Sequence, residues 1–359
     1  CDVSGKSGSL HRWDWRGNTL SGFPQPLDME TRSTAALADI DPAHPGREIL
    51  VLSGDSRLFA FRGDGQPVPG FPALKAWADV VNSSVAVGDM DRDGSPDIVA
   101  CTNKGAFVLD RQGRMLKGWP VSFSGLVLSS PALGDIDGDG YLEMAVAVDN
   151  KLHVYNYNGT MADGFPVEVS AGRLVQSSPI MIDVDGNGLP EVVIGSPDGS
   201  VVAYQSGGRR APGFPLTIGG GTYSTPLALD LNGNPANTEL AIGCDDGRLY
   251  VWSLPSAFSP RTSSWPGFHR DQANSGYLYW DLAQHPAQSN PELLSRAYVY
   301  PNPARGGSAR VRFTLGRPAD ITLRVFNIAG DMVREVRQAG LAGTENEVVW
   351  SLEGLSYGV

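Results

Sequence analysis

The sequence predicts an all-β protein in which a β-propeller precedes a small antiparallel β-sandwich. One unit recurs along most of the chain, and each copy contains short apolar runs rich in β-branched residues. After the last copy the pattern changes to alternating strands without the unit. Charged residues make up only 19% of the 359 residues, whereas Gly and Pro number 44 and 26, a composition typical of short strands joined by turns.

The repeat is marked by a Gly-Phe-Pro or Gly-Trp-Pro triplet at the end of each copy. The triplets lie roughly 46 to 49 residues apart, the period of a propeller blade rather than of a helical solenoid. Regular copies begin at Gly88, Gly134 and Ile182, and looser copies begin at Ala38 and Leu229. We therefore expect five complete blades and a partial one over residues 1–268.

Strand signals recur inside each copy. Residues 97–102, 191–196 and 239–244 are short apolar runs, and after a turn come alternating strands such as 151–157 and 248–254. Four short strands repeated radially form a propeller. A parallel β-helix would need shorter rungs, and a β-sandwich would not repeat at this period.

The start of the chain aligns with the interior of later copies. The segment from Cys1 resembles those from Cys101 and Cys244, so we expect it to begin inside the second strand of a blade, with residues missing upstream. The intact ring is then expected to have about six or seven blades. Three cysteines at equivalent repeat positions are too few for a disulfide framework and indicate small buried side chains. Lipid anchoring of Cys1 is the alternative.

Acidic loops precede the second strand of the regular copies. Counted from the first Asp, carboxylate or amide side chains occupy positions 1, 3, 5 and 9, and Gly occupies position 6, where it permits a sharp turn. Alternate residues of such a loop can point at one centre. Oxygen ligands in this number suit Ca²⁺, and no His or Cys joins them. The predicted ligands are Asp89, Asp91, Asp93 and Asp97; Asp135, Asp137, Asp139 and Glu143; and Asp183, Asp185, Asn187 and Glu191.

Two other interpretations of these loops were weighed. An EF-hand needs a Glu at position 12 and flanking helices, but position 12 is Ala100, Val146 or Ile194 and strands flank the loops. A metal-free turn rich in Asp and Asn is the second alternative. Three matching copies favour the calcium interpretation over this turn.

The outer two copies carry longer loops with fewer charges. We expect these loops to bind calcium more weakly, at the millimolar concentrations typical of extracellular modules. The net charge of −11 reflects the acidic loops and argues against a nucleic-acid or anionic-membrane partner. The predicted weaker ligands are Asp39, Asp41 and Glu48, with Pro42, His44 and Pro45 in the loop, and Asp230, Asn232, Asn234 and Glu239.

The repeated D-x-D-x-[DN]-G-x-x-[DE] loops and the Gly-Phe-Pro ends resemble the FG-GAP/VCBS repeats of integrin-α-like propellers. The resemblance covers about residues 1–268. It implies that calcium braces the hairpins of the blades, in a structural and not a catalytic role. This implication applies to the three regular loops.

A polar connector is predicted over residues 269–293, and its His269 and His285 are expected to be loop residues. Over 294–359 the alternating strands 309–315, 320–327, 332–338 and 346–352 predict an antiparallel sandwich.

The motifs "YPNP", "VFNIAGDMV" and "GLSYGV" in this region resemble the C-terminal sorting domain of the type IX secretion system and also the FlgD-type Ig-like module. Family members usually continue with another strand after the last motif, so both alternatives stay open. A sorting domain implies handling by the type IX secretion machinery. The protein would then be secreted from, or displayed on the outer surface of, a Gram-negative, Bacteroidota-like cell.

Catalytic signatures are missing from the sequence. It has no G-x-S-x-G, no H-E-x-x-H, no glycine-rich phosphate loop and no Cys/His pair, and no apolar run of about 18 residues that would span a membrane. Aromatic residues recur at equivalent repeat positions, where we expect packing between blades, with a carbohydrate-stacking platform as the alternative. They are Trp13, Trp15, Tyr155, Tyr157, Tyr204, Tyr250 and Trp252.

The function expected from these observations is that of a secreted or cell-surface binding and adhesion module. The calcium-braced propeller would present its loops to a protein or glycan ligand. Two alternatives remain: a polysaccharide lyase or hydrolase, which needs converging acid, base or Arg residues outside the calcium loops, and a structural spacer or assembly protein with a large exposed apolar patch.

Overall fold

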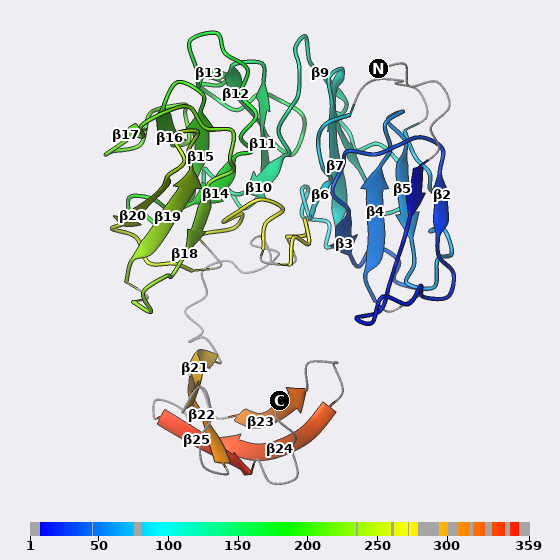
Figure 1. Ribbon diagram of the computed structural model, residues 1–359, viewed down its shortest axis with the longest axis vertical. Coiled ribbons are helices and arrows are strands. Elements are labelled where there is room, and N and C mark those ends of the chain that lie inside the picture. Colours follow the sequence, from blue (N-terminus) through cyan, green and yellow to red (C-terminus); the bar gives the residue numbers. More distant parts are fainter. Residues whose placement is uncertain are drawn as a thin grey trace. The chain divides into compact units, whose positions relative to one another are not determined.

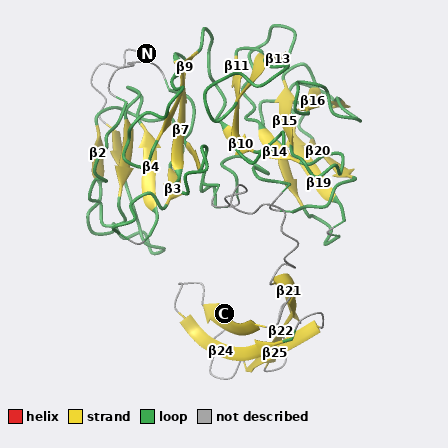
Figure 2. Ribbon diagram, turned by 180° about the vertical axis from the view of Figure 1, so that it is seen from behind, coloured by secondary structure: helices red, strands yellow, loops and turns green. Residues whose placement is uncertain are grey.

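The prediction of an all-β protein is confirmed. In the computed structural model, the described part of the chain consists of strands and loops and contains no helix (Figure 2). It therefore contains no helix of a length and hydrophobicity that would span a membrane. The chain divides into two compact units, residues 1–285 and 286–359. The described residues are 8–44, 46–74, 81–234, 236–259, 262–271, 273–278, 294–300, 308–315, 319–326, 332–341 and 345–351.

The first unit is a series of small antiparallel sheets, one for each repeat (Figure 1). In the three regular repeats, four strands follow one another in sequence order as a meander. Their strands are β6 (Ala86–Gly88), β7 (Asp97–Thr102), β8 (Gly105–Leu109) and β9 (Val121–Ser122); β10 (Ala132–Gly134), β11 (Glu143–Val148), β12 (Lys151–Tyr155) and β13 (Val167–Glu168); and β14 (Ile180–Ile182), β15 (Glu191–Ser196), β16 (Ser200–Tyr204) and β17 (Leu216–Thr217).

The outer repeats form smaller sheets of two or three named strands. Their strands are β1 (Gly8–Leu10) and β2 (Gln25–Leu27); β3 (Ala36–Ala38), β4 (Glu48–Leu52) and β5 (Leu58–Phe61); and β18 (Leu227–Leu229), β19 (Thr238–Gly243) and β20 (Leu249–Leu254). The apolar runs expected at 97–102 and 191–196 coincide with β7 and β15. These second strands are buried along their whole length, which explains their continuous apolar sequence.

The register of each sheet places its acidic loop between the first and second strands. Position 9 of the loop is the first residue of the second strand and pairs with the last residue of the first, as in Gly134↔Glu143 and Ile182↔Glu191. The two residues are held together by the ladder, so the loop between them is closed at its base. The fold therefore fixes the acid at position 9 next to the beginning of its own loop.

Neighbouring repeats meet at the glycine of the Gly-aromatic-Pro triplet. All five triplets, at Phe23, Phe71, Trp119, Phe165 and Phe214, contain a cis peptide bond before the proline. Gly118, which precedes Trp119, has a φ of 95°, and a Cβ atom there would overlap the carbonyl oxygen of Asn158 in the next repeat. The triplet glycine thus marks a point where two backbones approach too closely for any side chain in four of the five triplets, Gly213 being the exception.

A chain of hydroxyl groups also links successive repeats. The backbone N–H of Thr34 donates to Ser84 Oγ (3.0 Å), that of Ser84 to Ser130 Oγ (3.0 Å), that of Ser130 to Ser178 Oγ (2.9 Å), and that of Ser178 to Thr225 Oγ1 (3.3 Å). Each repeat therefore satisfies a buried donor of the repeat before it. This accounts for the Ser-Ser pairs that precede the regular copies.

The residues after the last repeat run back across the inner edge of the sheets. This crossing segment comprises residues 262–271 and 273–278. Trp265, which is buried, exchanges backbone hydrogen bonds with Met181 of β14 (2.9 and 3.1 Å). The carbonyl of Pro266 accepts from Ala228 of β18 (2.7 Å).

The crossing segment reaches the remaining repeats as well. Ser264 Oγ donates to the carbonyl of Leu133 in β10 (3.2 Å). The carbonyls of Ser275 and Gly276 accept from Leu37 of β3 and Val87 of β6, both at 2.7 Å. The first strands of five sheets are thus tied to one segment of chain.

The expected linker boundary differs from this arrangement. The prediction ended the propeller at residue 268, but residues up to Leu278 pack within the first unit, and Tyr277 and Leu278 are buried there. His269 was expected to be a loop residue. It lies in a turn, but its side chain is buried and its Nδ1 is 3.1 Å from the carbonyl of Asn274. His285 and the rest of the expected linker lie outside the described residues.

The repeat aromatics divide into two groups. Tyr155 and Tyr204 are buried, as expected for packing between blades, and Tyr157, Tyr250 and Trp252 are partly buried against the core. Trp13 and Trp15 contradict the expectation, because they are 56% and 70% exposed. Among the cysteines, Cys101 is buried and Cys244 half-buried, both as free thiols, whereas Cys1 lies outside the described residues.

The second unit consists of two antiparallel sheets over a small apolar core. One sheet has the order β21 (Leu294–Tyr300), β22 (Ser308–Leu315), β25 (Glu345–Ser351), and the other pairs β23 (Ala319–Phe326) with β24 (Met332–Gly340). Phe313, Leu315 and Val348 of the first sheet pack against side chains of the second. The four expected strands are present, whereas most residues of the three C-terminal motifs lie outside the described part.

Candidate metal centres

The acid at position 9 is buried at the end of each regular loop, where the second strand begins. Asp97, Glu143 and Glu191 are 1–2% exposed. One oxygen of each carboxylate accepts the backbone N–H of position 2, at 2.9 Å from Met90 and from Ile136 and at 2.8 Å from Val184. The loop thus folds back onto this acid.

The acid at position 1 holds the turn of the loop. In the loop 135–143, Asp135 Oδ1 accepts from Gly138 N (2.7 Å) and Oδ2 from Gly140 N (3.0 Å). Both glycines have left-handed backbone angles, with φ of 80° and 89°. Asp183 makes the equivalent bonds at 2.7 and 2.9 Å. The predicted need for Gly at position 6 is therefore met by the geometry.

Positions 1, 3 and 9 come together in all three regular loops. In each group, one ligand atom per acid lies within 4.8 Å of the others, a spacing that one metal ion can bridge. Among the described residues these are the acid groups that could hold an ion. They are Asp89, Asp91 and Asp97; Asp135, Asp137 and Glu143; and Asp183, Asp185 and Glu191.

The side chain at position 5 closes a turn of its own in each regular loop. The side-chain oxygens of Asp93, Asp139 and Asn187 accept the N–H two residues later, at 2.7 to 2.8 Å, and so close a local turn. Asp93 and Asp139 are not members of the acid groups. Asn187 remains close to its group, because its amide nitrogen is 3.2 Å from Glu191 Oε1.

Burial and mutual repulsion dominate the electrostatics of these groups. Burial raises the pKa of Glu143 to about 9, with further contributions from the carboxylates of Asp137 and Asp135. The same causes raise the pKa of Asp97 to about 8 and that of Glu191 to about 7. Within the described part, no Lys or Arg forms an ion pair with the acids of the loops 135–143 and 183–191.

These residues fit a hard divalent cation. The donor set is made of carboxylate oxygens, with no His or Cys, which suits Ca²⁺ or Mg²⁺ rather than Zn²⁺ or copper. An ion at the centre would supply the positive charge that the buried acids lack. The three regular loops are therefore candidate calcium sites held by positions 1, 3 and 9.

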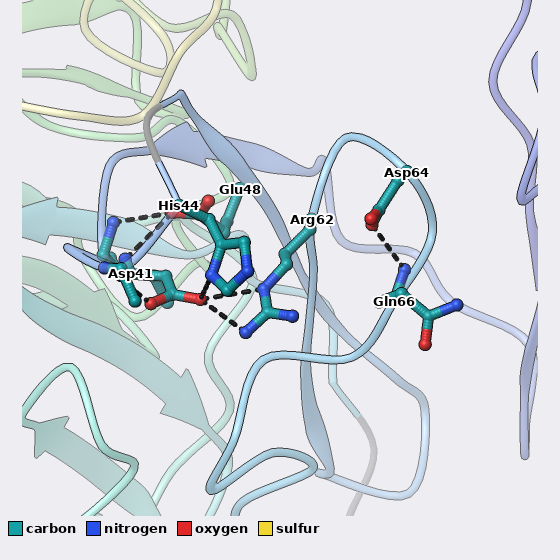
Figure 3. A network of polar contacts seen from close by, with 8 residues as sticks. Asp41, His44, Glu48, Arg62, Asp64 and Gln66 are labelled. Atoms are coloured by element: carbon teal, nitrogen blue, oxygen red, sulfur yellow. Dashed lines mark hydrogen bonds and ion pairs between the residues drawn. The ribbon is translucent and has the colours of Figure 1, made fainter.

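The loop 39–48 does not form such a group. Glu48 keeps the role of position 9, since its Oε2 accepts from Ile40 N (2.8 Å) and Asp41 N (3.1 Å), but Asp39 is exposed. Asp41 Oδ2 faces the guanidinium of Arg62 (Figure 3). Burial alone would raise the pKa of Asp41, but the hydrogen bonds from Arg62, the Ala43 N–H and His44 bring it below the ordinary value.

In the loop 230–239, amides replace two acids. Glu239 Oε2 accepts from Leu231 N (2.8 Å), and Asp230 Oδ1 accepts from Gly233 N (2.7 Å), as in the regular loops. The amide nitrogen of Asn232 donates to Glu239 Oε1 (2.6 Å). Asn234 closes a local turn, because its Oδ1 accepts from Ala236 N at 3.3 Å. This loop keeps hydrogen bonds of the regular loops, with two acids where those loops have three or four.

Comparison with known protein families assigns the central part of the chain. Residues 135–194 match the model of the FG-GAP-like repeat. The matched region begins at the first aspartate of the loop 135–143 and ends within β15, the strand that follows the loop 183–191. Both loops thus lie within the matched region, and the acids at positions 1, 3 and 9 lie at the same places in each. Comparison with curated proteins gave no match.

Solved structures show the same kind of fold at low identity. Sqt1 of Saccharomyces cerevisiae is 14% identical with a TM-score of 0.51, over 70% of this chain and 66% of that protein. The V. cholerae biofilm matrix protein Bap1 is 17% identical (TM-score 0.47), over 96% and 64%, and BBS1N in complex with ARL6DN is 17% identical (TM-score 0.45), over 70% and 72%. The chain thus spans just under two thirds of Sqt1 and of Bap1. The likeness to Sqt1 supports a propeller-like fold for the FG-GAP-like repeats.

The raised pKa values predict a characteristic pH dependence. Folded, metal-free protein holds protons on Glu191, Asp97 and Glu143 up to about pH 7, 8 and 9, whereas the unfolded chain releases them near pH 4. The folded state therefore binds more protons over this window, and its stability falls as the pH rises. We expect the melting temperature in EDTA to fall from about pH 5 to about pH 9.

Calcium should reverse this trend, because it binds the deprotonated carboxylates. The gap between the melting temperatures in calcium and in EDTA is expected to widen with pH, as measured by differential scanning calorimetry. A gap that stayed constant over this range would contradict the interpretation of these buried acids as candidate metal ligands.

Proposed function

We propose that the chain is a calcium-braced β-propeller that serves as a secreted or cell-surface binding module for a protein or glycan. The observation that carries the proposal is the group of three acids repeated in three successive loops. In each group at least one acid is buried and no His or Cys takes part, which suits a structural calcium ion. An ion in each loop would hold the first two strands of its sheet together.

The binding role follows from the repeat and its fold. FG-GAP-like repeats in a propeller-like arrangement suggest an interaction module, since a rigid scaffold presents connecting loops as recognition surfaces. We propose that the sheets serve as this scaffold and that the partner is extracellular. Export through a C-terminal sorting domain of the type IX system is the route we propose for the second unit.

The metal part of the proposal is tested at Asp137, an exposed member of its acid group. The variant Asp137→Ala removes a ligand and leaves the buried Glu143 in place. At free calcium about tenfold above Kd, one site adds about 1.4 kcal/mol, which corresponds to roughly 3–5 °C in melting temperature. We expect this loss in calcium and little change in EDTA.

A matched control is Asp64→Ala. Asp64 closes an exposed turn by accepting Gln66 N at 3.0 Å, as Asp137 accepts Asp139 N at 3.1 Å, but it belongs to no acid group. The loss of melting temperature in Asp64→Ala should be small, and equal in calcium and in EDTA. If Asp137→Ala also lost the same amount with and without calcium, its carboxylate would act through the turn alone and the proposal would be wrong.

The binding role is tested by applying the labelled full chain to arrays of glycans and of extracellular proteins, in calcium and in EDTA. Binding to a discrete ligand that depends on calcium supports the module. Release of reducing ends from the same glycans would instead favour a lyase or hydrolase.

A further inference from the structure

The register of the sheets defines one further position beside each acidic loop. It is the residue that lies opposite position 9, and in four of the five repeats it directly follows the third strand. In the fifth repeat this pairing is direct, Glu239↔Ser253, and in the others it is one step beyond the last named pair, such as Val192↔Tyr204. The residues at this position are Arg62, Asp110, Asn156, Gln205 and Ser253.

Arg62 differs from the others because it brings a positive charge into its loop. Its Nε and Nη2 atoms both lie 2.8 Å from Asp41 Oδ2. His44 Nδ1 lies 3.0 Å from the same oxygen (Figure 3). The side chains of Arg62 and Asp41 are only 19% and 9% exposed, so the pair is shielded from solvent. Charge-assisted bonds in such a setting are stronger than those of a surface ion pair.

The residues at this position in the three regular repeats bring no cation into their loops. In the fifth repeat Ser253 is also uncharged, and there Asn232 replaces the acid at position 3. Gln205 reaches the same place in the loop 183–191, where its Nε2 donates to Asp185 Oδ2 at 2.9 Å, but it is neutral. Asp110 and Asn156 turn away and bond within their own hairpins, to Arg114 and Thr160. All three of these repeats contain an acid group suited to a metal ion.

Asp41 and Asp185 are therefore equivalent acids with different partners. Each is position 3 of its loop, and each receives a hydrogen bond at about the same distance from the residue after the third strand. In one loop the donor is a cation and no acid group forms. In the other the donor is an amide and the group is complete.

We propose that Arg62 takes the place of the metal ion in the loop 39–48, and that a cation at this register keeps a loop from binding calcium. The guanidinium neutralises Asp41 from inside the fold, so this loop is braced without a divalent cation. The inference rests on the proposed calcium function of the regular loops. It corrects the expectation that Asp39, Asp41 and Glu48 form a weak calcium site.

The first test compares two position-3 aspartates in the full chain. Calcium bound at saturation is counted by native mass spectrometry, and melting temperatures are measured in calcium and in EDTA. Asp137→Ala should bind one calcium fewer than wild type. Asp41→Ala should bind the same number as wild type and lose equal stability in both conditions. Loss of an ion in Asp41→Ala would overturn the inference.

The second test transfers the arginine. Gln205→Arg should let the new guanidinium pair with Asp185, so that the chain binds one calcium fewer and loses part of its calcium-dependent rise in melting temperature. The control Gln66→Arg adds the same charge on an exposed turn and should keep the full count. A Gln205→Arg protein that retains every ion would contradict the role of this register.

The two proposals fail in different ways. Wild-type protein that binds no calcium contradicts both of them. Wild-type protein that binds calcium, with an ion lost on Asp41→Ala or none lost on Gln205→Arg, contradicts the arginine inference alone.

Discussion

Chelation of calcium is expected to lower the melting temperature of the protein by roughly 10 °C. Each of three loops contributes about 1.4 kcal/mol when free calcium exceeds Kd tenfold, which sums to about 4 kcal/mol, and 1 kcal/mol corresponds to roughly 2–4 °C in a domain of this size. The loops lie in separate sheets, so their contributions should add. Differential scanning calorimetry at about 1 mM calcium and in excess EDTA measures the difference.

The control for this result is the triple variant Asp91→Ala, Asp137→Ala and Asp185→Ala. It removes position 3 from every acid group and should melt at one temperature in both buffers. A wild-type protein that ignores EDTA would show that the acid groups are metal-free turns.

Gly118→Ala is expected to destabilise the protein by about 2–5 kcal/mol. The left-handed backbone at this residue costs an alanine about 1–2 kcal/mol. The added Cβ overlaps the carbonyl of Asn158 in the next repeat, and overpacking of this kind costs about 1–3 kcal/mol more. Urea denaturation at fixed calcium measures the loss.

Gly213→Ala is the matched control for Gly118→Ala. Gly213 has the same place in its triplet and a φ of 82°, but a Cβ there would meet no atom within 4 Å. Gly213→Ala should lose only the roughly 1–2 kcal/mol of stability that the left-handed backbone costs an alanine. Equal losses in the two variants would show that contact between neighbouring repeats adds nothing at the triplet.

The sequence predicted the repeated strands well, because each signal is local. The apolar runs that became β7 and β15 combine β-branched residues with flanking turns, and both faces of these strands are buried. The acidic loops were also predictable, since their spacing is itself the structure of a tight turn. Positions 1, 3 and 9 of the regular loops came together as that spacing requires.

Other features of the site depend on partners that are distant in sequence. Nothing local distinguishes Arg62 from a surface arginine, and only the pairing of β4 with β5 places it beside Asp41. Aligning the residue after each third strand would have singled it out. At position 5 an Asp or Asn can serve a metal or its own turn, and Asp93 and Asp139 close the turn. Their role as metal ligands stays a prediction.

Exposure and domain boundaries were equally hard to predict. Trp13 occupies the same strand position as the buried Tyr155, but it is exposed. The polar sequence predicts a linker from His269 onward. In the structure, backbone hydrogen bonds and the buried side chains of Tyr277 and Leu278 hold this stretch against the sheets.

The crossing segment has a consequence for how the protein folds as it is made. Ser275 bonds to Leu37, and Gly276 to Val87, so contacts on the inner edge join residues separated by most of the first unit. Such contacts raise the contact order and slow folding. During synthesis the five sheets can form one after another. The crossing segment can join them only after residue 278 has left the ribosome. Until then the first strands of the earlier repeats lack their hydrogen-bond partners in the crossing segment, and a chaperone would bind the chain at that stage.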